Sequence, residues 1–383
     1  MNKDIIFISC SKGIQPYLSE ELRSLDFPVV HEAFAGVLTK GGLDDAMALN
    51  LFLRTAHRVL YLLSEFKART SDELYRHLSA VAWEDYIHED GYISVASTID
   101  TPSIKDSRYA NQKCKDAIVD RLNKKYGRRP DSGPEKDSAV IHLHWKDDSC
   151  AVYIDTSGEP LSRRGYRKIP FKAPLQETLA AAIILASHWN IKRNFINPMC
   201  GSGTLAIEAA LIALNKAPGL LRNNYGFMHV KGFNNASWKM LREKANTLTI
   251  KTLPIRIIAS DIDPEAVEAA RKNAQTAGVE HLIEFICCDY AETPVPEGGG
   301  VIMLNPEYGE RMGTVNELEE VYKGIGDFFK QRCKGYTGYI FTGNPGLAKK
   351  VGLRSKRKLQ FFNSNIECRL IEYELYEGSK KHV

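Results

Sequence analysis

The sequence predicts two kinds of fold in one chain: an α+β region at the amino-terminal end, followed by an α/β domain with a mostly parallel sheet. The first 67 residues show the order βαββαβ, and residues 68–158 continue with helices and alternating strands. From Pro174 onward strands alternate with helices over about 210 residues, which is typical of a parallel sheet covered by helices. A length of 383 residues fits two or three domains.

The first unit, residues 1–67, is predicted from apolar spacing and from turn residues. Apolar side chains three and four residues apart predict a helix over Ile14–Leu25, and a Gly-Gly pair precedes a second helix that begins near Asp44. Short apolar runs predict the strands of this unit, which are Ile5–Ser9, Val29–Ala33, Val37–Lys40 and Arg58–Phe66.

The second segment, residues 68–158, is predicted to carry a basic helix between strands. In chain order we expect the helix Asp72–Val81, the strand Tyr92–Thr98, the basic helix from Asn111 to about Tyr126, and the strands Ala139–Trp145 and Cys150–Thr156. Residues 159–172 mix five basic side chains with Gly and Pro and are predicted to form a linker, so that the α/β domain covers residues 173–383.

The charge of the chain is unevenly distributed. The total is only +4, but residues 1–160 carry 20 basic and 25 acidic side chains, and residues 161–383 carry 31 and 22. Within the acidic half, Ser103–Arg129 holds nine Lys or Arg and three Asp. Such a stretch suits binding to a phosphate backbone, because each neutralised phosphate releases condensed counterions. A solvated helix face is an equally good interpretation of the charge density alone.

Several classes of protein are excluded by composition. No apolar run approaches the ~20 residues that a membrane-spanning helix needs, and the first residues lack the pattern of a secretory signal. The eight cysteines contain no CxxC pair, so neither a zinc site nor a disulfide framework is indicated. We therefore expect a cytoplasmic protein without a metal.

A glycine turn is the strongest local signal in the α/β domain. Phe195–Thr204 reads as a strand, a Gly-Ser-Gly turn at Gly201 and Gly203, and a helix that opens directly behind it. Glycine permits positive φ and a close approach of the backbone to a ligand. No Lys follows, so this is not a phosphate P-loop, and the GxGxxG pattern is absent. Alone, the feature is compatible with an ordinary turn.

Acidic residues follow the next two predicted strands. Asp261 ends the strand Pro254–Ser260, at a position where a carboxylate can accept from both hydroxyls of a ribose. Asp289 follows Ile283–Cys288 and is placed to accept from an exocyclic amine. Asp263 has a structural explanation instead, because it precedes a proline at the start of a helix and can act as its N-cap.

The fourth predicted strand, Val301–Leu304, leads into Asn-Pro-Glu-Tyr. The side-chain oxygen of Asn305 and the carbonyl of Pro306 are two acceptors on a stiff turn, and Tyr308 is an aromatic ring beside them. Two acceptors can bind both hydrogens of an aromatic amino group and stabilise charge that develops on its nitrogen. The ring can stack on a base removed from its helix. The alternative is an ordinary Asn-Pro turn.

In this order the four features resemble a class I S-adenosylmethionine-dependent methyltransferase. The resemblance becomes more specific in longer stretches and points to the guanine-N2 methyltransferases of large-subunit ribosomal RNA. The stretches that carry it are SGEPLSRRGYR, APLQETLAAAIIL, NPMCGSGTLAIEAA, APGLLR and NPEYGERM, together with SRYANQKCKDAIVDRL in the basic segment.

This resemblance covers nearly the whole chain and implies its layout. Residues 1–67 would be a ferredoxin-like unit, residues 68–158 an RNA-binding THUMP domain, and residues 173–383 a Rossmann-like methyltransferase domain with a mostly parallel, seven-stranded sheet. The long connection between Ala210 and Pro254 would decorate the catalytic face, and Lys172–Thr178 would close over the methionine end of the cofactor.

The resemblance also implies residue roles. S-adenosylmethionine would lie along the ends of the strands, with its ribose on Asp261 and its adenine amine on Asp289. The target guanine would be held by Asn305, Pro306 and Tyr308. The full set expected to bind the cofactor is Asn197, Pro198, Cys200, Gly201, Gly203, Thr204, Asp261, Ile262, Asp289, Tyr290 and Asn305. The set expected to bind RNA is Lys105, Arg108, Lys113, Lys115, Lys124, Lys125, Arg128, Arg163, Arg164 and Arg167.

The chain departs from the family pattern at two positions. Asn197 stands where the family usually has Asp, and Glu307 stands where it usually has a second proline. The Glu307 carboxylate either assists proton removal or points to solvent, and we favour solvent. We therefore expect transfer of a methyl group to the N2 of a guanosine in 23S ribosomal RNA. The alternatives are a transfer RNA guanine-N2 methyltransferase of the same layout and an RNA-binding ribosome-assembly factor with weakened catalysis.

Overall fold

The computed structural model describes residues 4–104, 106–170, 174–308 and 315–376, which form two compact units. The described residues of unit 1 come from Met1–Cys10, Leu18–Leu161 and Pro218–Ala245. Those of unit 2 come from Ser11–Tyr17, Ser162–Ala217 and Asn246–Val383. Each unit is built on a seven-stranded sheet, and the predicted α+β region followed by an α/β domain is confirmed.

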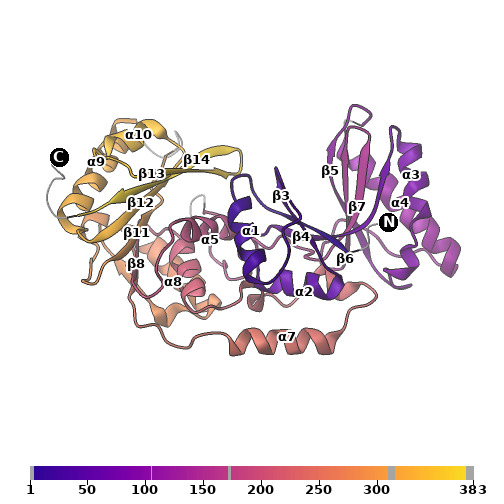
Figure 1. Cartoon of the computed structure of the whole chain (residues 1–383), viewed down its shortest axis with the longest axis horizontal. Helices are drawn as coiled ribbons and strands as arrows, with labels where there is room; N and C mark the ends of the chain where they lie inside the picture. Colours follow the sequence, from indigo (N-terminus) through magenta and orange to yellow (C-terminus); the bar gives the residue numbers. More distant parts are fainter. Residues whose placement is uncertain (1–3, 105, 171–173, 309–314, 377–383) are drawn as a thin grey trace. The chain divides into compact units, whose positions relative to one another are not determined.

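Unit 1 has one continuous sheet in the order β2-β3-β1-β4-β7-β6-β5 (Figure 1). Its strands are β1 (Ile5–Ser9), β2 (His31–Ala33), β3 (Gly36–Lys40), β4 (Arg58–Lys67), β5 (Ile93–Asp100), β6 (Ala139–Lys146) and β7 (Ser149–Asp155). The sequence pattern treats the first two segments as separate units, but β4 pairs with β7 from Leu60↔Asp155 to Lys67↔Ser149. The two segments therefore share a backbone hydrogen-bond network.

Helices cover this sheet with their apolar faces. They are α1 (Gln15–Ser24), α2 (Leu43–Phe52), α3 (Ser71–Ala80), η1 (Trp83–Asp85) and α4 (Ser107–Tyr126). Strand β1 shows the expected alternation, because Ile6 and Ile8 are fully buried while their neighbours are partly exposed. Helix α4 buries one face, including Cys114 and Ile118, while its basic residues are partly buried or exposed. Thus the predicted basic helix is a half-buried amphipathic one.

The long connection predicted between Ala210 and Pro254 belongs mainly to unit 1, not to the α/β domain that surrounds it in sequence. It forms η2 (Pro218–Leu221), η3 (Gly226–His229) and α7 (Asn235–Thr247). The Arg222 guanidinium donates to the carbonyls of Ser157, Glu159 and Pro160, and Val230 lies in the core beneath α3 and α4. The expectation that this segment decorates the catalytic face stays a prediction.

Unit 2 has a sheet in the order β10-β9-β8-β11-β12-β14-β13. Its strands are β8 (Asn194–Pro198), β9 (Ile257–Asp261), β10 (Ile283–Cys287), β11 (Gly300–Leu304), β12 (Tyr336–Thr342), β13 (Arg357–Asn363) and β14 (Ile366–Glu374). Its helices are α5 (Glu177–Ala186), α6 (Thr204–Ala213), α8 (Pro264–Ala277), η4 (Glu280–Leu282), η5 (Tyr290–Glu292), α9 (Val315–Arg332) and α10 (Pro345–Lys350). Figure 1 shows α5 and α8 on one side of this sheet and α9 and α10 on the other.

The sheet of unit 2 has the predicted seven strands but is mixed rather than mostly parallel. Strands β8 to β12 pair in parallel, whereas β14 pairs antiparallel with both β12 and β13. The physical reason is the tight turn at Ser364, where φ is +55°. A two-residue connection can join only antiparallel strands, because parallel neighbours need a long crossover. No helix of the described residues is both long and apolar enough to cross a membrane.

Candidate active site

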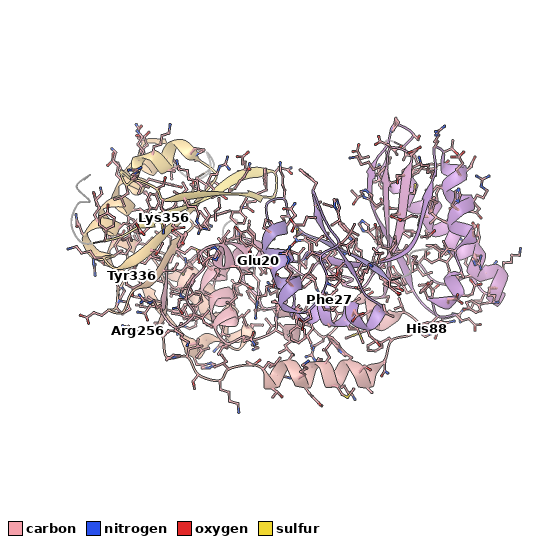
Figure 2. All side chains as sticks on the ribbon, viewed as in Figure 1. Glu20, Phe27, His88, Arg256, Tyr336 and Lys356 are labelled. Atoms are coloured by element: carbon pink, nitrogen blue, oxygen red, sulfur yellow. The ribbon has the colours of Figure 1, made fainter. Side chains whose placement is uncertain are left out.

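Four strand ends that carry polar residues lie side by side at one edge of the sheet of unit 2. The order β10-β9-β8-β11 places Asp289, Asp261, the loop Met199–Gly203 and Asn305 in a row. With strands about 4.8 Å apart, this row spans roughly 14 Å. The opposite edge is occupied by Arg256 and Tyr336, which Figure 2 labels and which both bond to Asn194.

The two glycines of the turn after β8 meet different surroundings. Gly201 has φ +53°, and a Cβ built on it would point into open space. Gly203 has φ +82°, and a Cβ there would lie 2.8 Å from the Cβ of Ala270 on α8. Gly201 therefore leaves room for a ligand, while Gly203 allows α6 to approach α8. The sequence pattern assigned both glycines to the ligand.

Asp261 is bound to this turn. Its Oδ2 accepts from the backbone N–H of Gly201 at 2.9 Å, and its Oδ1 accepts from that of Asp263 at 3.1 Å. A carboxylate offers about four acceptor positions, so two remain for a ligand. The next side chain, Ile262, is apolar and yet 69% exposed. Asp263 accepts from the Glu265 N–H as the N-cap of α8, which confirms its structural interpretation.

Asp289 and Tyr290, after β10, point in different directions. Asp289 is half-buried and its Oδ1 accepts from the Ala291 N–H at 2.8 Å, which caps η5. The Tyr290 hydroxyl donates to the Val321 carbonyl at 3.5 Å, and its ring packs edge-on against Phe328 of α9. The Tyr290 side chain thus packs partly into the core of unit 2.

Three further residues of the predicted cofactor set are buried beneath the turn. Asn197 is fully buried, and its Nδ2 donates to the Met303 carbonyl at 2.9 Å, which ties the ends of β8 and β11 together. An aspartate at this position could not donate to that carbonyl. Pro198 is also buried, and burial raises the pKa of the Cys200 thiol well above its usual range. Cys200 is therefore a neutral, buried thiol in the turn after β8.

Asn305 has an acceptor with no partner. Its Oδ1 is shielded from solvent and makes no hydrogen bond within the described residues. Pro306 is buried, whereas Glu307 is exposed, as expected for a carboxylate that points to solvent. The Tyr322 hydroxyl of α9 donates to the Glu307 carbonyl at 3.4 Å and so connects the turn after β11 to this helix. Eleven other side-chain atoms of the described residues share this property, Asn197 Oδ1 among them, so what distinguishes Asn305 Oδ1 as an unpartnered buried atom is its place at the end of β11 in the row of strand ends.

Tyr308 is half-buried and fixed at both ends of its side chain. Its hydroxyl accepts from Asn363 Nδ2 at 3.0 Å, and its ring lies over Gly343, where a Cβ would come within 2.9 Å of ring atoms. Burial raises the pKa of the Tyr308 phenol to about 12, so the hydroxyl stays neutral at physiological pH.

The structure corrects the RNA-binding set at Arg164. This side chain is 2% exposed, and its guanidinium donates to both carboxylate oxygens of the fully buried Glu208. Arg167 is largely buried too and donates to the Leu175 carbonyl and to Thr204 Oγ1. The hydroxyl of Thr204, which was predicted to bind the cofactor, is therefore already hydrogen-bonded to Arg167. Of the three arginines predicted around the Gly165 turn, only Arg163 is exposed.

The remaining predicted RNA-binding residues lie on or beside α4, apart from Lys105, which is outside the described residues. Lys124, Lys125 and Arg128 are exposed at the carboxyl end of α4 and just after it. Arg108 pairs with Asp106 at the other end. Lys113 and Lys115 are partly buried and pair with Asp72 and Asp116. Apart from Arg108, the exposed residues of this set thus lie at the carboxyl end of the helix.

Sequence reasoning missed two residues that organise the site. Glu208 is the one charge in the apolar sequence TLAIEAALIA of α6, and a lone buried charge signals a partner. Asn363 bonds to Tyr308 from 55 residues away, and no sequence signal links the two.

Comparison with known families matches three parts of the chain. A family described as "RMKL-like, methyltransferase domain" matches residues 164–372, an "RlmL ferredoxin-like domain" matches residues 5–60, and a "THUMP domain" matches residues 68–155. The three kinds of domain implied by the sequence resemblance are thereby confirmed.

Individual relatives are similar over almost the whole chain. The ribosomal RNA large subunit methyltransferase K/L of Syntrophotalea carbinolica is 38% identical over 97% of this chain and 53% of its own length. The chain thus spans about half the length of the curated relatives of this kind. A Synechocystis protein named as an RNA methyltransferase is 33% identical over 97% of this chain and 96% of its own. A methyltransferase crystallised with SAH is 30% identical, with a TM-score of 0.89 over 99% of this chain and 100% of its own.

Proposed function

We propose that this chain, which belongs to the RMKL-like methyltransferase-domain family, transfers a methyl group from S-adenosylmethionine to the exocyclic N2 of a guanosine in 23S ribosomal RNA. The reaction would take place in the cytoplasm, with RNA as the macromolecular partner. The observation that carries the proposal is the buried, unpartnered Oδ1 of Asn305 at the end of β11. Such an acceptor costs about 1–3 kcal/mol when unpaired, so an incoming amino group stabilises it.

The strand-end row fits S-adenosylmethionine. Asp261 has acceptor positions left for ribose hydroxyls, and the exposed Ile262 offers an apolar surface to a purine ring. Asp289 is half-buried after the neighbouring strand β10. Gly201 leaves open space on the β8 side, toward the methionine end. The cofactor supplies a methyl group already activated on a sulfonium, so the residues of this chain need only bind, orient and stabilise.

The target amine would be oriented by the turn after β11. Asn305 Oδ1 and the Pro306 carbonyl would each accept one N–H of the amino group and thereby direct its lone pair. The same two acceptors would stabilise positive charge as it develops on the nitrogen. The ring of Tyr308 would stack on the guanine after the base leaves its helix. Glu307 is exposed, and we assign it no role in the transfer.

A matched pair of variants tests these assignments. Purified protein is mixed with labelled S-adenosylmethionine and undermodified 23S ribosomal RNA, and the RNA is digested to nucleosides. We expect N2-methylguanosine from wild type and a loss of roughly 100-fold or more for Asn305→Ala, with cofactor binding nearly intact. Asp261→Ala should instead weaken cofactor binding.

The outcomes separate the candidate functions. Methylation of transfer RNA without methylation of ribosomal RNA would favour the alternative, a transfer RNA guanine-N2 methyltransferase with the same domain layout. Cofactor and RNA binding without any methylated nucleoside would contradict the enzyme and favour an assembly factor. Equal losses of cofactor affinity in both variants would contradict the separate roles of Asn305 and Asp261.

A further inference from the structure

The side chain of Tyr308 is fixed by the β13–β14 hairpin and by the end of β12. Asn363, the last residue of β13, donates to the Tyr308 hydroxyl at 3.0 Å, and the Cys368 thiol of β14 lies 3.8 Å from the same oxygen. On the other side, a Cβ on Gly343 would lie 2.9 Å from Cε2 of the Tyr308 ring. The ring thus lies over a position with no side chain.

The same glycine position brings the hairpin to the ring. A Cβ on Gly343 would also lie 2.9 Å from Cγ2 of Ile366, the first residue of β14. Ile366 is 52% exposed, so an apolar side chain stands beside Tyr308 at the surface. The hydroxyl, the ring and this neighbouring side chain are therefore all set by the segment after β12.

The hairpin that carries Asn363 is itself well anchored within unit 2. Strand β13 pairs with β14 along its whole length, from Arg357↔Glu372 to Asn363↔Ile366. Phe361 is fully buried and packs edge-on against Phe341 of β12. Tyr17, from the short Ser11–Tyr17 stretch of this unit, stacks on Phe361 with ring centroids 5.7 Å apart. Asn363 therefore ends a strand that cannot shift freely.

We infer, on the basis of the function proposed above, that Asn363 is a positioning residue that sets the angle of the Tyr308 ring and so the place of the target base. The amide acts through the Tyr308 hydroxyl and does not touch the reacting atoms. Without its hydrogen bond the ring can rotate about its side-chain torsions, and the stacked base moves with it. A misplacement of about 1 Å is enough to cost roughly 100-fold in rate.

A double-mutant cycle of Asn363→Ala and Tyr308→Phe tests the coupling. We expect Asn363→Ala to lower kcat roughly 10-fold to 100-fold, while the cofactor dissociation constant stays within about twofold of wild type. In the Tyr308→Phe background the same substitution should cost nothing more. Additive losses, or an unchanged kcat in Asn363→Ala, would overturn the inference.

The matched control is Asn365→Ala, at the exposed turn of the same hairpin, for which we expect wild-type kinetics. If Asn363→Ala does not fold, Gly343→Ala serves as the second variant, because its Cβ must displace the Tyr308 ring. A Gly343→Ala protein that folds and keeps wild-type kcat would contradict the role of the ring position.

A measurement that does not depend on enzyme activity separates this inference from the proposed function. In protein labelled with 3-fluorotyrosine, the resonance absent from Tyr308→Phe belongs to position 308, and Asn363→Ala should broaden or shift it. An unchanged resonance would refute the positioning role even if N2-methylguanosine forms. If wild type yields a different methylated nucleoside, the proposed function fails, and the cycle measured on that product still decides the role of Asn363.

Discussion

Two stretches with a similar density of basic residues differ in how far those residues are buried. Along α4 and just beyond it, Lys124, Lys125 and Arg128 are exposed and available to a polyanion. In the stretch before the α/β domain, Arg164 is buried against Glu208, and Arg167 is bound to the start of α6. Charge density along the sequence is the same kind of signal in both places, but in the second stretch Arg164 is buried and Arg167 largely so, while Arg163 and Lys168 stay exposed.

The difference arises from partners far away in the sequence. A buried guanidinium is costly to desolvate unless a carboxylate and further hydrogen bonds satisfy it. Glu208 supplies the carboxylate, and the Tyr166 hydroxyl donates to the same group at 3.1 Å. Burial raises the pKa of Tyr166 well above its usual range, so this network keeps a neutral phenol. Within the described residues, no buried network of this kind forms at Lys124, Lys125 or Arg128.

The largest expected effect concerns Arg164. Arg164→Ala should lower the free energy of unfolding by about 3–5 kcal/mol, because Glu208 is left as a buried charge without its partner. Denaturant unfolding followed by circular dichroism measures this. The double variant Arg164→Met with Glu208→Leu should recover most of the loss. A single variant as stable as wild type would show that the pair is not buried in solution.

A smaller effect, on RNA binding alone, is expected for the exposed cations of α4. Changing Lys124, Lys125 and Arg128 to Gln should reduce the slope of log affinity against log salt by roughly 2–3, at about 0.7–0.9 for each phosphate contact. The unfolding midpoint should not move. Filter binding over a salt series gives the slope.

The matched control for this triple variant removes the same charge elsewhere. Lys239, Lys244 and Lys251 are exposed on α7 and shortly after it, and their change to Gln should leave the slope as in wild type. If both triples lower the slope equally, RNA is not bound preferentially at α4, and the comparison between the two basic stretches loses its functional meaning.

The smallest effect is expected for Arg108, whose side chain is 90% exposed and pairs with Asp106 two residues away. Exposed pairs of this kind contribute little, so Arg108→Ala should keep the wild-type unfolding midpoint. The salt slope should fall by less than about one. A loss of affinity as large as that of the triple variant would place the main contact at the other end of α4.

Local patterns in the sequence were sufficient to predict most helices and strands, but not to predict how the strands pair. Strand β1 lies at the predicted Ile5–Ser9, and Asp263 caps α8 as its spacing to Pro264 predicts. The antiparallel insertion of β14 was missed, because strand direction depends on a turn whose geometry one residue, Ser364, decides. The predicted domain boundaries stay predictions, and the one between residues 172 and 173 lies outside the described residues, as do Lys172 and part of NPEYGERM.

The candidate site was predictable to the extent that strand ends define it. Asp261, Asp289 and Asn305 follow strands, and the order of those strands brings them into one row. Exposure was not predictable, since burial depends on tertiary packing: Asn197, Thr204 and the Tyr290 side chain are engaged by neighbours on other elements. The cofactor and target roles of the residues in the row remain to be measured.

Unit 1 is built from segments that lie far apart in the sequence, and this constrains how the chain can fold during its synthesis. Unit 1 contains Leu18–Leu161 but also Pro218–Ala245, and its core includes Val230. The ribosome must therefore add roughly 80 residues beyond Leu161, including β8 and α6 of unit 2, before unit 1 has all its parts. At about 5–20 residues per second this takes on the order of 4–16 s. Until Arg222 has been added, the carbonyls of Ser157, Glu159 and Pro160 lack its guanidinium, and until Ala245 has been added the nascent chain carries an unfinished core.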